Sequence, residues 1–180
     1  MESHKELMHS YLCESLRELM TRSVFEKITI KQICDRTGVI RATFYNYFDD
    51  KYDCLNAIVK HDISEFSRET NTEAAVRRVL SEIDRNRDFY RAAYNVTGQN
   101  GFEDMVRRNL AAQLKEYLDR NRKPAAMNAY SNDLLARYFA ECIAFDIREF
   151  VFREDDARGV DGMTQMVIDL MRTSLVDLLG

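Results

Sequence analysis

The stretch ITIKQICDRTGVIRATFYNYFDD, residues 28–50, decides the fold. It begins with Thr29 and Gln32 at the spacing of a capping box, in which each side chain accepts a hydrogen bond from the other residue's backbone N–H. That helix is expected to end at Gly38, because glycine readily adopts the left-handed conformation that terminates a helix. A second short helix is expected over about Arg41 to Tyr47. Two short helices around a tight turn form a helix-turn-helix.

The aromatic side chains of the second short helix divide between two faces. Phe44 and Phe48 are four residues apart, so they lie on one face and are expected to be buried. The opposite face carries side chains of the types that bind base edges and phosphates or allow close approach: Arg41, Ala42, Thr43, Tyr45, Asn46 and Tyr47. The alternative is that this face is only a solvated surface and that its tyrosines are half-buried core.

The rest of the chain has the pattern of further helices. Apolar residues recur at helical spacing, the chain contains one proline and six glycines, and no alternation is long enough to build a sheet. We therefore expect an all-α fold. Outside the motif, helices are expected over residues 4–21, from a cap at Asp49 or Asp50 through residue 59, within 72–95, and over 102–119, 127–152 and 163–179.

The charge of the chain is unevenly distributed. The whole chain has a net charge of −4, which does not by itself suggest a nucleic-acid binder. Between residues 22 and 48, however, five cationic side chains stand against two anionic ones. Because electrostatic attraction to phosphate is local, a small basic region on an acidic protein can still bind DNA.

Several classes of protein do not fit the sequence. No apolar run approaches the roughly 18 residues of a membrane span, and the N-terminus is unlike a signal peptide, so we expect a cytoplasmic protein with no membrane partner. The cysteines and histidines lack the spacing of a metal site, so free thiols, no metal and no cofactor are expected. Glu141 and Asp146 are the candidate acid and base, but no nucleophile accompanies them, and an enzyme is not expected.

The stretch FEKITIKQICDRTGVIRATFYNYFDDKYDCL, residues 25–55, resembles the N-terminal domain of tetracycline-repressor (TetR) family transcriptional regulators. The resemblance rests on the capping Thr29, the RTGV turn, the TFYNYF segment and Lys51, three residues after the last phenylalanine. It implies a helix-turn-helix DNA-binding domain over residues 1–50 and a domain for effector binding and dimerisation over residues 51–180.

The resemblance also implies a function. We expect a homodimer that binds a palindromic double-stranded DNA operator, acts as a repressor, and is controlled by a small-molecule effector. The alternative is the same DNA-binding fold controlled by a protein partner, as an activator.

The resemblance implies roles for individual residues of the motif. Tyr45 and Tyr47 contact phosphates or sugars, Thr43 and Arg41 approach bases or the backbone, and Lys51 binds phosphate. The full set of expected DNA contacts is Thr29, Lys31, Ile40, Arg41, Ala42, Thr43, Tyr45, Asn46, Tyr47 and Lys51.

Ile40 departs from the family's pattern, which commonly has serine or another polar residue there. An apolar residue at the start of a helix lacks a side-chain acceptor, at a typical cost of about 1 kcal/mol. Ile40 either packs on a thymine methyl or the sugar backbone, or only closes the turn.

The C-terminal part offers two further sets of residues. The resemblance implies an effector pocket, for which the alternative is ordinary core, and its expected residues are Tyr90, Tyr94, Phe102, Met105, Tyr117, Tyr138 and Cys142. The helix around residues 127–152 is apolar nearly all round, so one side is expected to meet the core and another a partner subunit. The resemblance implies a four-helix dimer interface built from this helix and the last one, and its expected residues are Phe139, Ile143, Ile147, Phe150, Val167, Leu170, Met171 and Leu178.

Overall fold

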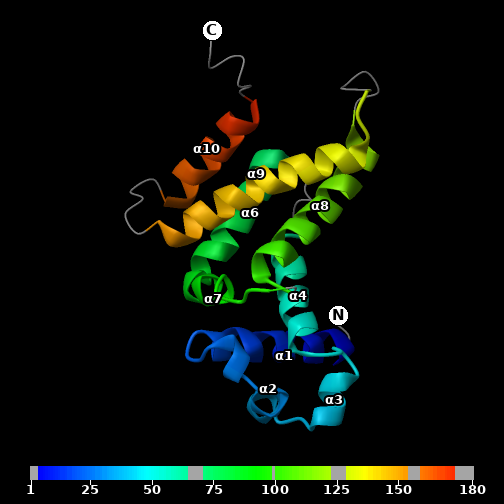
Figure 1. Ribbon diagram of the computed structural model, residues 1–180, viewed down its shortest axis with the longest axis vertical. Helices are drawn as coiled ribbons and strands as arrows, with labels where there is room; N and C mark the ends of the chain where they lie inside the picture. Colours follow the sequence, from blue (N-terminus) through cyan, green and yellow to red (C-terminus); the bar gives the residue numbers. More distant parts are fainter. Residues whose placement is uncertain (1–3, 65–70, 99, 123–128, 154–158, 173–180) are drawn as a thin grey trace. The chain divides into compact units, whose positions relative to one another are not determined.

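A computed structural model describes residues 4–64, 71–98, 100–122, 129–153 and 159–172 (Figure 1). Within these ranges every regular element is a helix, which confirms the all-α expectation. The elements are α1 (His4–Met20), the 3-10 turn η1 (Phe25–Lys27), α2 (Ile30–Thr37), α3 (Arg41–Tyr45), α4 (Lys51–Asp62), α6 (Thr72–Arg85), α7 (Arg87–Ala93), α8 (Phe102–Asn121), α9 (Asn132–Phe152) and α10 (Gly159–Arg172). None of these helices is long and apolar enough to cross a membrane.

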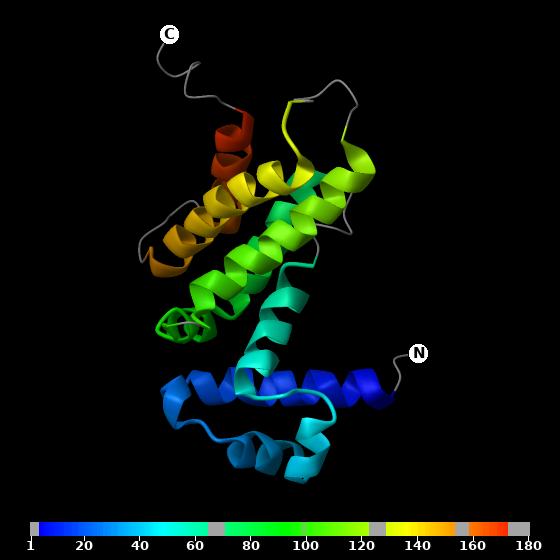
Figure 2. The same ribbon diagram turned by 45° about the vertical axis from the view of Figure 1, so that its right-hand side comes forward.

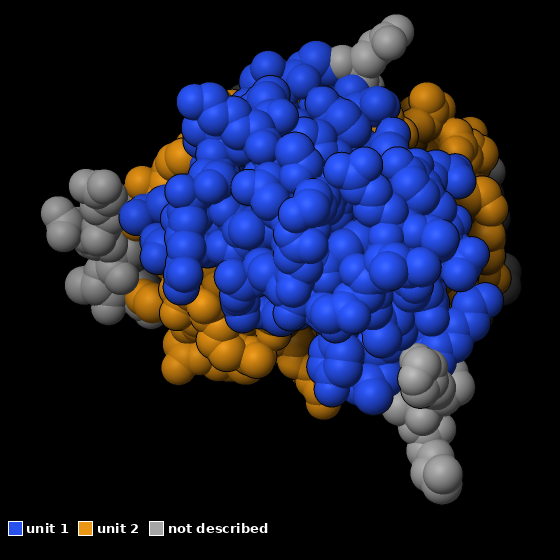
Figure 3. Space-filling view, turned by 90° about the horizontal axis from the view of Figure 1, so that it is seen from below, with its two compact units in different colours: residues 1–61, 88–105 blue, residues 62–87, 106–180 orange. Residues whose placement is uncertain are grey.

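The chain divides into two compact units, coloured separately in Figure 3. Unit 1 comprises residues 1–61 and 88–105, and unit 2 comprises residues 62–87 and 106–180. The N-terminal helices therefore share unit 1 with nearly all of α4, with α7 and with the segment that leads into α8. This division differs from the functional boundary that the sequence suggested after residue 50.

The local signals of the motif form as expected. The Thr29 hydroxyl accepts a hydrogen bond from the Gln32 backbone N–H at 3.3 Å, and Gln32 Oε1 accepts one from the Thr29 N–H at 2.8 Å. Gly38 ends α2 with φ 69° and ψ 22°. The second helix of the motif is shorter than expected, because the N–H groups of Asn46 and Tyr47 bond carbonyls only three residues back and tighten the chain into a turn.

The core of unit 1 includes side chains from each of the first three helices, whose ribbons are blue to cyan in Figure 2. Leu12 and Leu16 of α1, Ile33 of α2 and Phe44 of α3 are fully buried. Between α1 and α2, the buried Ser15 hydroxyl donates to the Ile33 carbonyl at 2.9 Å. The apolar contacts supply most of the free energy that stabilises the fold. The hydrogen bond gives a partner to the Ser15 hydroxyl and the Ile33 carbonyl, which would be costly to bury without one.

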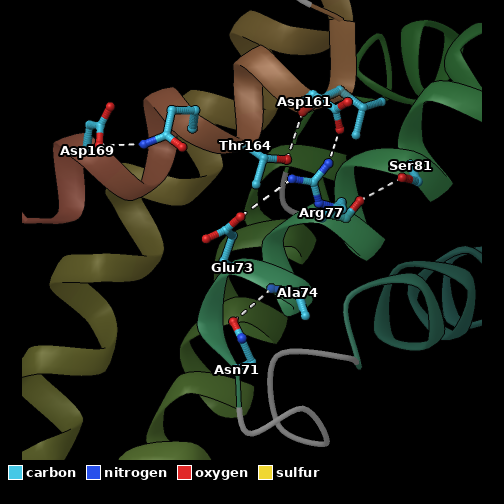
Figure 4. A network of polar contacts seen from close by, with 10 residues as sticks. Asn71, Glu73, Ala74, Arg77, Ser81, Asp161, Thr164 and Asp169 are labelled. Atoms are coloured by element: carbon cyan, nitrogen blue, oxygen red, sulfur yellow. Dashed lines mark hydrogen bonds and ion pairs between the residues drawn. The ribbon is translucent and has the colours of Figure 1, made fainter.

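Unit 2 is built from helices that polar contacts tie to one another. Arg77 of α6 pairs with Glu73 on its own helix and with Asp161 of α10 (Figure 4). Arg107 of α8 pairs with Glu141 of α9 at 2.9 Å. Exposed pairs of this kind contribute at most about 1 kcal/mol each, so they align helices whose buried apolar faces provide most of the stability.

Two helix starts in unit 2 differ from the sequence-based expectation. The long helix begins at Asn132, where the Ser131 hydroxyl accepts a hydrogen bond from the Leu134 N–H at 3.2 Å. The last helix begins at Gly159 rather than near residue 163. The sequence pattern predicts a later start because glycine is more typical of loops than of helix interiors. The expected end of that helix, including Leu178, lies outside the described residues.

Candidate nucleic-acid interface

The outward face of α3 carries most of the side chains that the sequence singled out. Tyr45 is 56% exposed, and Arg41, Ala42 and Asn46 are exposed as well. Phe44 and Phe48 are buried beneath them, with ring centroids 5.4 Å apart. The predicted division of the aromatic residues is therefore confirmed for these three rings.

Tyr47 and Thr43 are only half-exposed. The Tyr47 ring lies 6.5 Å from the His9 ring of α1, and the His9 ring lies 4.8 Å from that of Phe48. The alternative of a half-buried tyrosine thus applies to Tyr47, whose ring packs against α1 at one side of the face, but not to Tyr45.

Ile40 occupies the N-cap position of α3. Its backbone is extended, with φ −85° and ψ 158°, and no side-chain hydrogen bond caps the helix, as expected for an apolar residue. The side chain is 71% exposed. An apolar side chain that is so open contributes little to the core.

The start of α2 presents Thr29 and Lys31 to solvent. The Thr29 hydroxyl takes part in the capping box and also donates to Gln32 Oε1 at 2.9 Å. Lys31 is 66% exposed and pairs with Asp35 one turn later at 2.9 Å. Because an exposed pair of this kind is weak, the Lys31 ammonium can exchange Asp35 for a phosphate at little cost.

Lys51 has a different environment from the one that the sequence suggested. Its ammonium donates to the carbonyl oxygens of Phe25, Glu26 and Ile28 at 2.8, 3.1 and 3.0 Å. It also lies 4.6 Å from the centroid of the Phe25 ring. An ammonium has three N–H donors, so all three are used within the protein. Burial lowers the pKa of Lys51, and the nearby Glu26 and Asp50 carboxylates partly offset this effect.

The expected phosphate contact of Lys51 therefore has no free donor in this geometry. Instead, Lys51 joins the first residue of α4 to η1 and to the residue before Thr29. Sequence reasoning missed this role because the partners are backbone carbonyls 23 to 26 positions away in the chain.

Asp50 caps α4, which settles the choice between Asp49 and Asp50. Asp50 Oδ1 accepts hydrogen bonds from the N–H groups of Tyr52 and Asp53 at 2.7 and 2.8 Å. These first N–H groups of the helix are therefore occupied by a carboxylate. They are therefore not available to bind another anion.

The seven residues of the expected effector pocket do not come together within one unit. Tyr90, Tyr94, Phe102 and Met105 belong to unit 1, where the Phe102 ring packs 5.9 Å from that of Tyr90 and 5.0 Å from that of Tyr94. This packing fits the alternative of ordinary core. The other three residues, in unit 2, are Tyr117, which is half-buried, Tyr138, which is 63% exposed, and Cys142, which is exposed.

Half of the expected dimer residues belong to the core of unit 2. Ile143, Ile147, Phe150 and Val167 are at most 3% exposed, so they cannot also face a partner subunit. Leu170 is 54% exposed, and Phe139 and Met171 are half-buried. The sequence could not assign the faces because this helix is apolar on nearly every side.

The exposed apolar residues of α9 are a different set. They are Leu134, Tyr138, Phe145 and Phe152, with exposures of 45%, 63%, 62% and 47%. At 100° per residue these four positions fall within about 40° of one another around the helix. We call this set the α9 stripe. These residues are separated by four, seven and seven positions in the sequence, and this spacing is the signal from which the α9 stripe could have been predicted.

The candidate acid and base residues have other environments. Glu141 is exposed and pairs with Arg107, whereas Asp146 is buried in α9, where burial raises its pKa to about 6. Among the described residues no group of three or more histidine, cysteine or acidic side chains could hold a metal ion.

Comparison with known families identifies the N-terminal segment. The family model for bacterial regulatory proteins of the tetR family matches residues 13–58, about a quarter of the chain, which extend from α1 through the motif into α4. Residues 13–58 therefore form a helix-turn-helix domain of the tetR family of bacterial regulatory proteins.

A curated relative is similar to part of the chain. The HTH-type dhaKLM operon transcriptional activator DhaS of Lactococcus lactis subsp. lactis (strain IL1403) is 23% identical over 87 residues. These residues make up 46% of this chain and 46% of DhaS, so the chain spans less than half the length of this relative.

Solved structures extend the similarity of fold to most of the chain. The structure of a dihydroxyacetone kinase operon activator DhaS has a TM-score of 0.67 and 18% identity, covering 92% of this chain and 94% of its own. A TetR-family transcriptional regulator from Syntrophomonas wolfei str. Goettingen has a TM-score of 0.64 and 18% identity, covering 93% and 94%. At these identities the likeness concerns the fold alone.

The two lysines of the interface should respond differently to replacement. Lys51→Met removes three hydrogen bonds to carbonyls and should lower the free energy of unfolding by about 1–3 kcal/mol. It should leave the dependence of DNA affinity on salt unchanged. Lys31→Met, the matched control, should leave unfolding nearly unchanged and reduce the slope of log affinity against log salt by about one.

Urea unfolding monitored by circular dichroism and fluorescence-anisotropy titrations at several salt concentrations measure both quantities. If Lys51→Met lowers the salt slope without destabilising the protein, Lys51 is a phosphate contact after all.

Proposed function

We propose that this regulator binds a palindromic DNA operator as a homodimer, through the outward faces of two α3 helices, and that an effector acting on residues 51–180 controls the binding. The observation that carries the proposal is the α3 face itself. Tyr45, Arg41 and Asn46 are exposed on a helix that is fixed from beneath by buried Phe44 and Phe48. Such side chains can bind phosphates and base edges without any rearrangement of the core.

The proposed DNA contacts keep most of the set expected from the sequence. They are Thr29, Lys31, Ile40, Arg41, Ala42, Thr43, Tyr45, Asn46 and Tyr47, of which Thr43 and Tyr47 are the least accessible. Lys51 enters the proposal as a positioning residue, because its ammonium already has three carbonyl partners.

The α9 stripe supports the homodimer. Four large apolar side chains aligned on one helix are costly to leave in water, and covering each one fully contributes about 1.5–3 kcal/mol. A two-fold dimer would bring the stripe against its own copy, with Leu170 of α10 as a further exposed apolar residue. Two recognition helices related by a two-fold axis bind half-sites about one turn of DNA apart.

The control mechanism follows from linkage. An effector changes operator affinity only by the difference between its affinities for the DNA-competent and the DNA-incompetent state. A small molecule remains our first proposal for the effector, and a protein partner the second.

One observation favours activation over the repression that we expected from the sequence. DhaS, which is similar to this chain in sequence, is named as an operon activator. Transcription in vitro from a promoter that carries the selected operator distinguishes the two possibilities, because a repressor lowers and an activator raises the yield of transcript.

In vitro selection of bound duplexes from a random pool tests the proposed function. The full chain should select a palindrome whose half-sites lie about one helical turn apart. Tyr138→Asp combined with Phe145→Asp should disrupt the dimer and reduce the selected sequence to a single half-site. Ala112→Asp, at an exposed position of α8, is the matched control and should retain the palindrome.

Sedimentation equilibrium on the same variants reports the oligomeric state directly. Selection of no preferred sequence by the unmodified chain would refute the proposed function. An unmodified chain that selects a palindrome but sediments as a monomer would refute the proposed interface.

The exposed side chain of Ile40 leads to a separate prediction about the sequence of the operator. We propose that its open side chain packs against the methyl group of one thymine in each half-site, since it lies at the start of α3 and is 71% exposed. Replacing that thymine by uracil removes only the methyl group and should weaken binding about fourfold. Binding of the Ile40→Ala variant should not distinguish thymine from uracil. If no uracil substitution weakens binding by the unmodified chain, Ile40 serves only to close the turn.

A further inference from the structure

A cavity of about 350 Å³ lies within unit 1, between the chain that joins α1 to η1 and the end of α7. It is lined by residues 20 and 22–26 on one side and by Ala92, Asn95 and Val96 on the other. Its volume is at the lower end of the range for pockets that bind small molecules. Neither the proposed DNA contacts nor the expected effector residues line it, so it has no role in the function proposed above.

The walls of this cavity are held in place by contacts within unit 1. The Arg17 guanidinium of α1 lies 4.7 Å from the centroid of the Phe89 ring of α7, so the two helices pack against each other. After α7, the Val96 N–H donates to the Ala93 carbonyl, and the Val96 carbonyl accepts from the Phe102 N–H, both at 2.9 Å. A ligand loses little affinity to the ordering of a site that is formed in advance.

The apolar side chains that line the cavity differ in their exposure. Met20, Phe25 and Val96 are at most 3% exposed. Val24 is 59% exposed and Ala92 is half-exposed, so these two present apolar surface to water. An apolar group of a ligand that covers Val24 and Ala92 removes apolar surface of both molecules from water, which favours binding. We therefore expect the ligand to carry an apolar group.

Side chains of opposite charge line the same cavity. Arg22 and Glu26 are both exposed, and within the described residues the Arg22 guanidinium has no hydrogen bond or ion pair. Glu26 lies near the Lys51 ammonium. Because all three N–H donors of Lys51 bond carbonyls, the Glu26 carboxylate can still accept hydrogen bonds. The cavity therefore offers donors for a carboxylate and an acceptor for an ammonium group.

We propose that this cavity binds a small zwitterion, namely an α-amino acid with an apolar side chain. The Arg22 guanidinium donates two hydrogen bonds to the carboxylate of the ligand, and the Glu26 carboxylate accepts one from its ammonium group. The apolar side chain of the ligand lies against Val24 and Ala92. A ligand that carries only a carboxylate has no partner for Glu26 and is repelled by it, and a ligand that carries only an ammonium group is repelled by Arg22. Both charges of the ligand are therefore needed.

Occupation of the cavity acts on the start of α2 through η1. Phe25 and Glu26 line the cavity, and their carbonyls accept two of the three hydrogen bonds from Lys51. A ligand that contacts both η1 and the end of α7 favours this arrangement of η1 and the position of α2 that follows from it. Because the proposed DNA contact uses this position of α2, the ligand raises operator affinity. This consequence rests on the proposed DNA-binding function, whereas the binding of the ligand does not.

Isothermal titration calorimetry on the full chain tests the binding, with L-leucine and L-phenylalanine as the probes. Each probe has two matched analogues. Isoamylamine and phenethylamine lack the carboxylate, whereas isocaproate and hydrocinnamate lack the ammonium group. We expect one molecule of at least one of the two amino acids to bind per chain. Both of its analogues should bind at least about tenfold more weakly, because each leaves a charged side chain of the cavity without a partner.

Variants of the lining residues locate the site. Arg22→Met should weaken binding of the amino acid about tenfold and leave the affinity for the amine unchanged, because the amine has no carboxylate. Glu26→Gln should likewise weaken binding of the amino acid but not that of the carboxylate analogue. Ala92→Phe should fill the cavity and abolish binding of every probe. Lys27→Met, at an exposed position of η1 outside the cavity, is the matched control and should bind as the unmodified chain does. Circular dichroism verifies that each variant is folded.

Operator binding measured with and without the amino acid tests the consequence. Affinity for the selected palindrome, measured by fluorescence anisotropy, should rise about tenfold when the cavity is saturated, which is within the usual range of coupling between two sites. At the same concentration of amino acid, the operator affinity of Ala92→Phe should not change.

Binding of neither amino acid, or binding that Arg22→Met and Glu26→Gln leave unchanged, would overturn the proposed site. An analogue that binds as tightly as its amino acid would overturn the requirement for both charges. Saturation of the cavity without any change in operator affinity would overturn its effect on α2. Failure of the chain to select any operator, with or without the amino acid, would refute the proposed function and leave the result of the calorimetry intact.

Discussion

The contact between the Lys51 ammonium and three carbonyl oxygens is the constraint on which the helix-turn-helix of α2 and α3 depends. These carbonyls belong to Phe25, Glu26 and Ile28, so the bonds fix the chain just before α2 begins and join it to the first turn of α4. The capping box at Thr29 then sets the start of α2, and Gly38 sets its end. The position of α3 follows from these two fixed points and from the burial of Phe44 and Phe48.

This arrangement changes the electrostatic character expected of the DNA contact. With the Lys51 ammonium turned toward the protein, Arg41 is the cation that α3 itself provides, and Lys31 of α2 is held in a weak pair with Asp35. The tyrosine hydroxyls, the Asn46 amide and the apolar Ile40 make up much of the remaining face. Binding should therefore depend on shape and hydroxyl contacts as well as on phosphate attraction, in a chain whose net charge is −4.

The sequence was most informative about interactions between residues that are close together in the chain. The capping box, the left-handed glycine and the opposed phenylalanines and tyrosines involve residues within four positions of one another, and each took the predicted form except at Tyr47, which is half-buried. The role of Lys51 could not be predicted, because its carbonyl partners look alike in any sequence. The core and surface sides of α9 could not be assigned either, because Ile143 and Phe145 have similar hydropathy although one is buried and the other is 62% exposed. Only packing against the neighbouring helices separates them.

The central claim is that the outward face of α3, together with the start of α2, is the surface that binds DNA. Amide chemical-shift mapping on the isotope-labelled full chain, during titration with a palindromic duplex obtained by selection, tests this claim directly. The account predicts the largest shifts at residues 29–31 and 40–47. Shifts concentrated on the exposed side of α9, with residues 40–47 unaffected, would contradict it.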